Sequence, residues 1–422
     1  MDSHEPVPAS TRPARPSLGG NYWRLWTSAA LSNLADGILK IALTLVAVGF
    51  TRSPGLIAGL AFAFTMPWLL FSLPAGAIAD RFDRRKLMLG ANVLRATLLG
   101  ATALTVLLDV GSIWVLYIVA LFAGTAETIY DTAAQSLVPQ VAPRDQLPRA
   151  NGRMYAAELT SNEFVGPPLA GFLVAAGAAI ALATPAALWV VAIVALLLVR
   201  GSFRIERDPG QTASMRHDIA EGIRFLWHNS FLRMFAAVAG VFNFASSAMQ
   251  AVLVLYVVGS TSAMGLSEQA YGWLLSTIAV GSLLGSFLAD RIERVVGRTR
   301  TLVLGFIAGS LFVGAPALTA NPYLVGAAFF VGGAGLVIAN VVMLSLRQRI
   351  TPERLLGRVN SGILFVAGGI KPLGAVAAGV LAQLFGVRAV FVIMGLLSLA
   401  TLFTTRKMTD EAMDAAERRP DH

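Results

Sequence analysis

Five carboxylates interrupt apolar segments that are long enough to cross a bilayer: Asp36, Glu127, Asp131, Glu158 and Glu163. An ionisable side chain at mid-bilayer costs roughly 2.5–3.5 kcal/mol on insertion scales, so each needs a reason to be there. Counted along a helix from the cytoplasmic ends of their segments, Asp36, Glu127 and Glu158 lie about 15–17 Å deep. Three carboxylates at one depth predict a shared site, and a carboxyl that titrates near pH 7 is what proton coupling requires.

A spacing of four residues places several of these groups on a common helix face. The pairs are Glu127 with Asp131, Glu158 with Asn162, and Asp36 with Lys40. Asp36 and Lys40 are oppositely charged, which predicts either a neutral ion pair that stabilises the segment or a part of the site. Glu127 has no basic neighbour on its own segment, which favours a role in coupling. Asp131 is nearer to the cytoplasm, where loop arginines are within reach, and Glu163 is assigned no role.

Lysine is rare in the chain, yet Lys40 and Lys371 both lie inside apolar segments. Lys371 precedes Pro372 in a glycine-rich stretch. This setting predicts either a cavity-facing group that binds an anion or a carboxylate, or a salt bridge that locks two parts of the molecule together. Arg95, the other base inside a segment, is expected to extend toward the cytoplasmic face.

Composition excludes most other classes of protein. The 422 residues are 56% hydrophobic and 14% charged, and the mean hydropathy is +0.68. Soluble proteins average about 45–50% hydrophobic and about 25% charged residues. The chain has no cysteine, its histidines lie in polar stretches, and no Gly-Lys-Ser/Thr loop is present. We therefore predict a membrane protein that is not an enzyme, hydrolyses no ATP, and holds no metal or cofactor. The net charge of +9 indicates basic loops beside a membrane and no nucleic-acid partner.

Twelve apolar segments follow one another, each long enough for a membrane-spanning helix. They lie at about 22–50, 55–79, 86–108, 112–138, 147–178, 180–199, 231–258, 270–290, 300–319, 322–346, 357–385 and 387–405. Basic residues gather in alternate connections, whereas the opposite connections hold only Arg52 and Arg388. The positive-inside rule therefore places both termini in the cytoplasm and the protein in the inner (plasma) membrane.

The chain divides into two similar halves. The motif Ala79-Asp80-Arg81 recurs as Ala289-Asp290-Arg291, 210 positions later, and Arg149 and Asn151 match Arg358 and Asn360, 209 positions later. We predict an all-α protein of two six-helix repeats. Its parts are a disordered arm (1–20), a first bundle (21–200), a cytoplasmic linker with an amphipathic helix (201–230), a second bundle (231–406) and a cytoplasmic tail (407–422).

Residues Gly76–Arg85 read Gly-Ala-Ile-Ala-Asp-Arg-Phe-Asp-Arg-Arg. This stretch resembles the loop signature of the major facilitator superfamily, except at Asp83, where the family often has glycine. The sequence Gly-Pro-Pro-Leu-Ala-Gly at 166–171 is similar to the superfamily's antiporter element. The start of the fifth segment and residues 221–224 resemble the branch of macrolide and siderophore exporters.

The resemblance implies the twelve-helix major facilitator fold and a role for each motif. It assigns a gating loop, which holds one state of the transport cycle together, to Gly76, Asp80, Arg81, Arg84, Arg85, Asp290 and Arg291. It assigns the antiporter element to Gly166, Pro167 and Gly171. The remaining candidates, for proton coupling or the substrate cavity, are Asp36, Lys40, Glu127, Asp131, Glu158, Asn162 and Lys371.

The sequence thus predicts a proton-coupled secondary transporter that exports an amphipathic small molecule by alternating access. The molecule is expected to be a drug or a macrolide-like or siderophore-like compound, and the transporter to be a monomer. An importer or uniporter of the same fold is one alternative. A membrane receptor or scaffold that moves nothing is the other, although it would have no use for carboxylates at mid-depth.

Overall fold

The computed structural model describes residues 17–201, 203, 224–406 and 408–418. The predicted arm falls largely outside the described residues, as does most of the predicted linker helix. The first half contains α1 (Gly20–Phe50), α2 (Pro54–Arg81), α3 (Arg84–Leu107), α4 (Ile113–Val141), η1 (Arg144–Gln146), α5 (Leu147–Leu159), η2 (Thr160–Val165), α6 (Gly166–Ala176) and α7 (Ala178–Leu197). The second half contains α9 (Ser230–Val257), α10 (Glu268–Val296), α11 (Arg298–Leu318), α12 (Pro322–Ile350), α13 (Glu353–Gly369), α14 (Lys371–Phe385), α15 (Val387–Ala400), α16 (Leu402–Thr405) and α17 (Asp410–Glu417).

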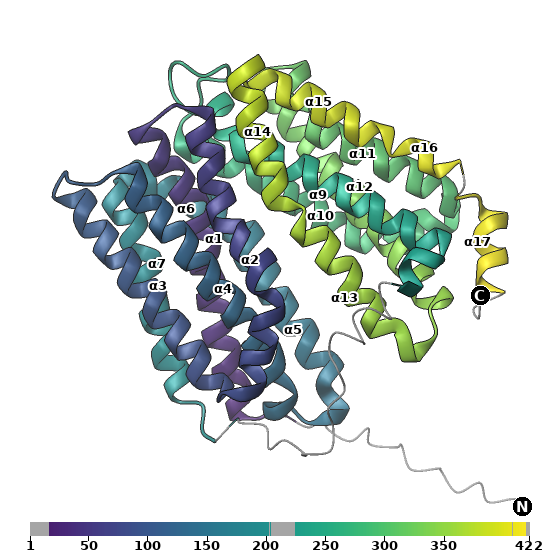
Figure 1. Cartoon of the computed structure of the whole chain (residues 1–422), viewed down its shortest axis with the longest axis horizontal. Helices are drawn as coiled ribbons and strands as arrows, with labels where there is room; N and C mark the ends of the chain where they lie inside the picture. Colours follow the sequence, from purple (N-terminus) through teal and green to yellow (C-terminus); the bar gives the residue numbers. More distant parts are fainter. Residues whose placement is uncertain (1–16, 202, 204–223, 407, 419–422) are drawn as a thin grey trace, which may run out of the picture.

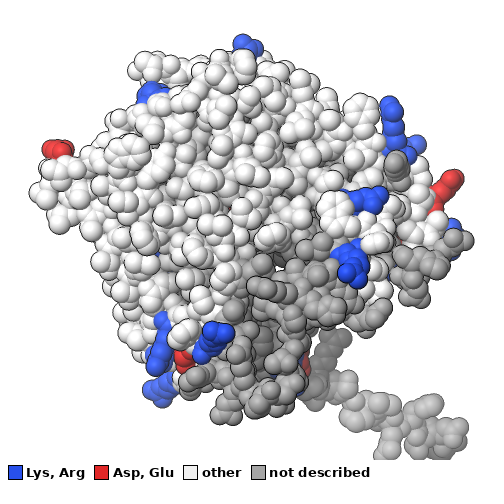
Figure 2. All heavy atoms as spheres, in the orientation of Figure 1, with Lys and Arg blue, Asp and Glu red and all other residues white. Residues whose placement is uncertain are grey.

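Eleven helical stretches among the described residues are long and apolar enough to cross a membrane. The remaining predicted segment, 147–178, consists of α5, η2 and α6 in direct succession. Its η2 is a π-helix, a widened turn that is common at functional sites. The segment is less apolar than the others because it carries Arg149, Arg153, Glu158 and Glu163. On the face shown in Figure 2, charged side chains lie near the ends of the molecule, with a broad uncharged band between them.

The two halves have the same internal packing (Figure 1). In the first half α2 packs on α4, α3 on α4 and α7, and α1 on α6 and α7; in the second, α10 packs on α12, α11 on α12 and α15, and α9 on α14 and α15. Each second-half pair is the counterpart of a first-half pair six segments earlier. The predicted duplication is therefore confirmed, and the chain is an all-helical membrane protein of two repeated bundles.

Helix direction defines two ends of the molecule. The linker end holds Gly20, Leu197 and Ser230, and the hairpin end holds the short connections at 51–53, Gly177 and Gly386. The halves join through α6 against α10 and α2 against α14. Gly272 lies against the backbone of Pro167, and at mid-depth Gly368 lies against the Trp68 ring. This seam is packed from the hairpin end to mid-depth.

The predicted tail contains a docked helix, α17. The side chains of Met408 and Met413 are fully buried in the second half. Arg298, at the start of α11, forms ion pairs with Asp414 (3.1 Å) and Glu417 (3.0 Å). The C-terminal helix α17 therefore packs against the linker end of the second half.

Candidate functional site

An ion pair joins α1 to α4 near mid-depth. Lys40 Nζ lies 2.9 Å from Glu127 Oε1, and the two side chains are 37% and 18% exposed. The expectation from sequence that Glu127 has no basic neighbour on its own helix holds, but in the folded protein α1 supplies Lys40 as its partner. Counting along one helix could not reveal a partner on another. The pair remains accessible, so either charge can respond to a proton or a ligand.

A second ion pair joins α1 to α3. Arg95 Nη1 lies 2.6 Å from Asp36 Oδ1, and the side chains are 0% and 3% exposed. The expectation that Arg95 extends to the membrane surface is therefore wrong. Of the two alternatives for Asp36, the ion pair with Lys40 does not form, because Asp36 pairs with Arg95. Arg95 stays inside because a carboxylate compensates its charge, which an isolated arginine in an apolar segment would lack.

Further contacts surround the two terminal nitrogens and the faces of the Arg95 guanidinium, whereas its Nε forms no hydrogen bond within the described residues. Its Nη2 donates to Ser32 Oγ (3.0 Å) and to Asn92 Oδ1 (2.6 Å). Its Cζ lies 4.9 Å from the ring centre of Tyr130 and 4.8 Å from that of Trp189. Hydrogen bonds and two cation–π contacts thus hold this cation in the core of the first half. Of this set, only Asp36 was among the predicted site residues.

The π-helix η2 brings the fifth segment against α1. Asn162 Nδ2 donates to Asn33 Oδ1 (3.1 Å), and Gly37 faces the backbone of Ser161 and Asn162. A side chain at Gly37 would leave no room for this approach. Glu158, two residues before η2, is exposed.

Charges from both halves meet beside the Lys40–Glu127 pair. Glu158 interacts electrostatically with Lys40, Glu127 and Glu163. Lys371, exposed at the start of α14, interacts with Lys40, Glu127 and Glu163. Within the described part of the chain, Glu158 and Lys371 form no ion pair. Their charges are therefore available to a proton or a ligand.

One polar cluster thus contains most of the predicted candidates. Asp131 joins it through electrostatic interactions with Glu127, Asp36 and Glu158. We name as the central cluster Asp36, Lys40, Glu127, Asp131, Glu158, Glu163 and Lys371. Asn162 lies at its edge through η2. The sequence had left Glu163 without a role, and its proximity to Lys40 and Lys371 could not be seen from spacing.

The predicted gating loop connects α2 to α3 at the linker end. Arg84 Nη1 donates to the Ser136 carbonyl (2.9 Å), and Arg85 donates to the carbonyls of Leu196 (2.9 Å) and Leu197 (2.7 Å). The two arginines thus bind carbonyls near the C-terminal ends of α4 and α7, where cations are favoured.

The other gating candidates differ in their surroundings. Asp83, the departure from the family pattern, caps α3 by accepting from Lys86 N (3.1 Å). Gly76 has free space around its Cα. Arg81, Asp290 and Arg291 are exposed, and the side chain of Asp80 lies outside what the structure describes.

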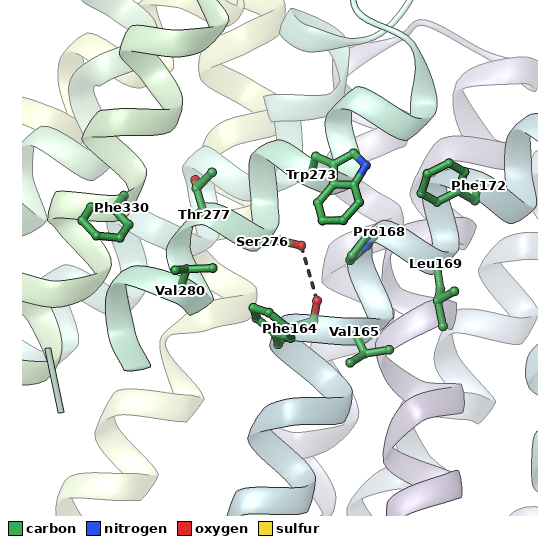
Figure 3. Close-up of a pocket in the computed structure, with 10 residues that line it drawn as sticks. All are labelled: Phe164, Val165, Pro168, Leu169, Phe172, Trp273, Ser276, Thr277, Val280 and Phe330. Carbon is green, nitrogen blue, oxygen red and sulfur yellow. Dashed lines mark hydrogen bonds between the residues drawn. The ribbon is translucent and has the colours of Figure 1, made fainter. Parts of the chain in front are cut away.

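The predicted antiporter element lies at the seam between the halves. Gly166, Pro167 and Gly171 are buried, and Gly171 faces the backbone of Glu268 at the start of α10. Ser276 Oγ of α10 donates to the Phe164 carbonyl (3.4 Å), across the same seam (Figure 3).

An apolar groove of about 500 Å³ adjoins this seam. Trp273 and Phe172 are prominent in its lining, together with Phe330 of α12 (Figure 3). Trp273, Ser276 and Thr277 of α10 line the groove, and no sequence pattern predicted it.

Solved structures of membrane transporters share this architecture of two repeated helical bundles. The solved structure of the nucleoside transporter NupG covers 92% of the chain and 99% of its own, with a TM-score of 0.70 at 14% identity. A bacterial homologue of the iron transporter ferroportin covers 96% and 100%, with a TM-score of 0.71 at 18% identity. At such identities these similarities show the fold alone.

Residues 15–422 match the family described as transmembrane secretion effector, and the chain belongs to this family. A relative named multidrug efflux pump Tap, from Mycolicibacterium fortuitum, is 27% identical over 87% of this chain and 91% of its own. Tap of Mycobacterium tuberculosis (strain H37Rv) is 28% identical over 90% and 92%. The MFS-type transporter YfiS of Bacillus subtilis (strain 168) is 26% identical over 88% and 89%. The chain is therefore a secondary transporter and not an enzyme.

Proposed function

We propose that this transporter exports an amphipathic small molecule, such as a drug or a macrolide-like or siderophore-like compound, in exchange for protons. The observation that carries the proposal is the central cluster, where charged groups of both halves meet at mid-depth. Export is supported by the relatives named multidrug efflux pumps and by the Gly166–Gly171 element at the seam.

Proton coupling would act through the accessible carboxylates of the cluster. A proton on Glu127 removes the partner of Lys40 and breaks the α1–α4 ion pair. A proton on Glu158 changes the charge that faces Lys40. Either event alters the electrostatic free energy of one conformation relative to the other, and a transporter needs that difference to link a proton to a conformational change. Asp36 is sealed by Arg95 and is the weakest carrier of the three.

Membrane orientation follows from the basic loops. We place the linker end, with both termini, in the cytoplasm and the protein in the inner (plasma) membrane as a monomer. The packed hairpin end then faces outward, so the structure is closed to the outside and the central cluster is reached from the cytoplasm. The gating arginines lie on the cytoplasmic side, where their contacts would form and break during each cycle.

The test is reconstitution into liposomes with an imposed pH gradient and ethidium as the probe. The expected result is gradient-driven ethidium accumulation that nigericin abolishes. Equal movement with and without the gradient would favour the uniporter. Absence of movement of ethidium, of a macrolide and of a ferric siderophore would favour the receptor or scaffold.

A further inference from the structure

The two ion pairs of the first half lie in adjacent layers. Asp36 and Lys40 are four residues apart on α1, and Glu127 and Tyr130 are three residues apart on α4. Such spacings are about one helical turn on each helix, or about 4.5–6 Å along the axis. The layer around Arg95 therefore lies one turn from the Lys40–Glu127 pair on both helices that form this pair.

The Arg95 layer joins four helices. The guanidinium contacts Asp36 and Ser32 of α1, Asn92 of its own helix α3, Tyr130 of α4 and Trp189 of α7. The planar guanidinium has donors in fixed directions and two flat faces, so it restrains the distance and rotation of each neighbour in a way that a lysine cannot.

The two layers differ in accessibility. Arg95 is 0% exposed and Lys40 is 37% exposed. Breaking the buried Arg95–Asp36 pair would leave a buried charge without a counter-ion, so this pair does not exchange partners readily. The accessible Lys40–Glu127 pair can exchange partners, because water can solvate the separated charges. The sealed layer is thus suited to hold α1 and α4 in register while the accessible pair opens and closes.

We propose that Arg95 and Asp36 are positioning residues, which fix α1 against α4 so that Lys40 and Glu127 meet, and that Asp36 carries no proton in the cycle. This inference rests on the proposed function, which gives the Lys40–Glu127 pair its role in coupling. Asp36 is then a structural anion and Glu127 the responsive one, although the two carboxylates lie in adjacent layers of the first half.

The chain has no cysteine, so a Lys40→Cys/Glu127→Cys variant carries only the two introduced thiols. The rate at which a short bifunctional methanethiosulfonate links them, in membranes, reports the register of α1 and α4. Introducing Asp36→Asn and Arg95→Gln into this double-cysteine variant removes both buried charges, so that neither is left without a partner. We expect linking to slow at least fivefold in the resulting variant. With Arg95→Lys in its place, which retains the charge but not the planar guanidinium, linking should slow about twofold.

The matched control is Tyr22→Phe, which removes a buried hydrogen bond from α1 to the Ala150 carbonyl of α5, outside the Arg95 layer, and should leave the linking rate within twofold. An unchanged rate in the Asp36→Asn/Arg95→Gln background would overturn the inference. If the Asp36→Asn/Arg95→Gln protein does not reach the membrane, the linking rate with Arg95→Lys is the test. A rate equal to that of the double-cysteine variant alone would then also overturn the inference. The linking assay involves no transport, so it can fail while the proposed function stands, or succeed while that function fails.

A second readout addresses the proton. With Lys40 and Glu127 intact, the Asp36→Asn/Arg95→Gln variant should retain a dependence of ethidium efflux on the pH gradient, at a rate reduced severalfold. Loss of gradient dependence with normal downhill exchange would show that Asp36 is a proton carrier and would overturn the inference.

Discussion

The two halves share their packing but differ in their chemistry. At the repeat offset of 209 residues, Asp36, Lys40, Glu127 and Glu158 correspond to Ala245, Met249, Leu336 and Ala367. Lys371 is the one charge that the second half adds to the central cluster, and its counterpart in the first half is Asn162. Duplication thus preserved the helix pairs, which need only apolar and small residues. All five carboxylates of the central cluster lie in the first half.

The largest expected effect comes from removing one member of the sealed pair. Asp36→Asn leaves the Arg95 charge buried and uncompensated, so we expect the free energy of unfolding to fall by about 3–5 kcal/mol. Ala245→Ser, at the counterpart position in the second half, should lower it by no more than about 1 kcal/mol, because a helical serine can bond its own backbone. Thermal unfolding in detergent measures both. Similar losses in the free energy of unfolding for Asp36→Asn and Ala245→Ser would contradict the inference that the halves differ at this position.

The seam between the halves should respond next. A methyl group at Gly272 would collide with the backbone of Pro167, so Gly272→Ala should separate the halves at the hairpin end. We expect the closed population to fall about tenfold, which corresponds to about 1.4 kcal/mol. Spin-label distances between cysteines introduced into the connections at the hairpin end would measure it. Gly100→Ala, where free space surrounds the glycine, is the control, and equal distance distributions for the two variants would rule out this role of the seam.

The gating loop offers a smaller contrast between the halves. Asp80→Asn should leave the protein folded in the membrane and slow ethidium efflux severalfold, because a charge contact must form and break in each cycle. Asp290→Asn, in the weaker second copy, should slow efflux by no more than about twofold, since an exposed charge pair contributes only about 0–1 kcal/mol. Efflux rates normalised to membrane expression decide the matter. Wild-type rates for Asp80→Asn would remove the gating assignment.

Hydrophobic run length and basic-loop patterning were sufficient to predict the helices and the repeat, because lipid imposes both on the sequence. The same reasoning located the mid-depth carboxylates and placed them in one cluster. The sequence did not predict the basic residues with which these carboxylates form ion pairs. Arg95 was expected at the membrane surface, and the pairing of Glu127 with Lys40 was not predicted, because a partner on another helix depends on rotation and register. Neither quantity is encoded in the spacing along one helix, and the π-helix at 160–165 had no sequence signal that we could identify.

The claim that the central cluster couples protons to export is tested most directly by proton flux itself. Liposomes that contain the transporter and a trapped pH-sensitive dye are given an ethidium gradient and no pH gradient. For the wild type, ethidium that leaves down its gradient should drive protons in the opposite direction. With Glu127→Gln this proton flux should vanish while ethidium exchange persists. The Glu158→Gln and Asp36→Asn/Arg95→Gln variants, compared in the same assay, rank the other two carboxylates. Undiminished proton flux in both Glu127→Gln and Glu158→Gln would contradict the account.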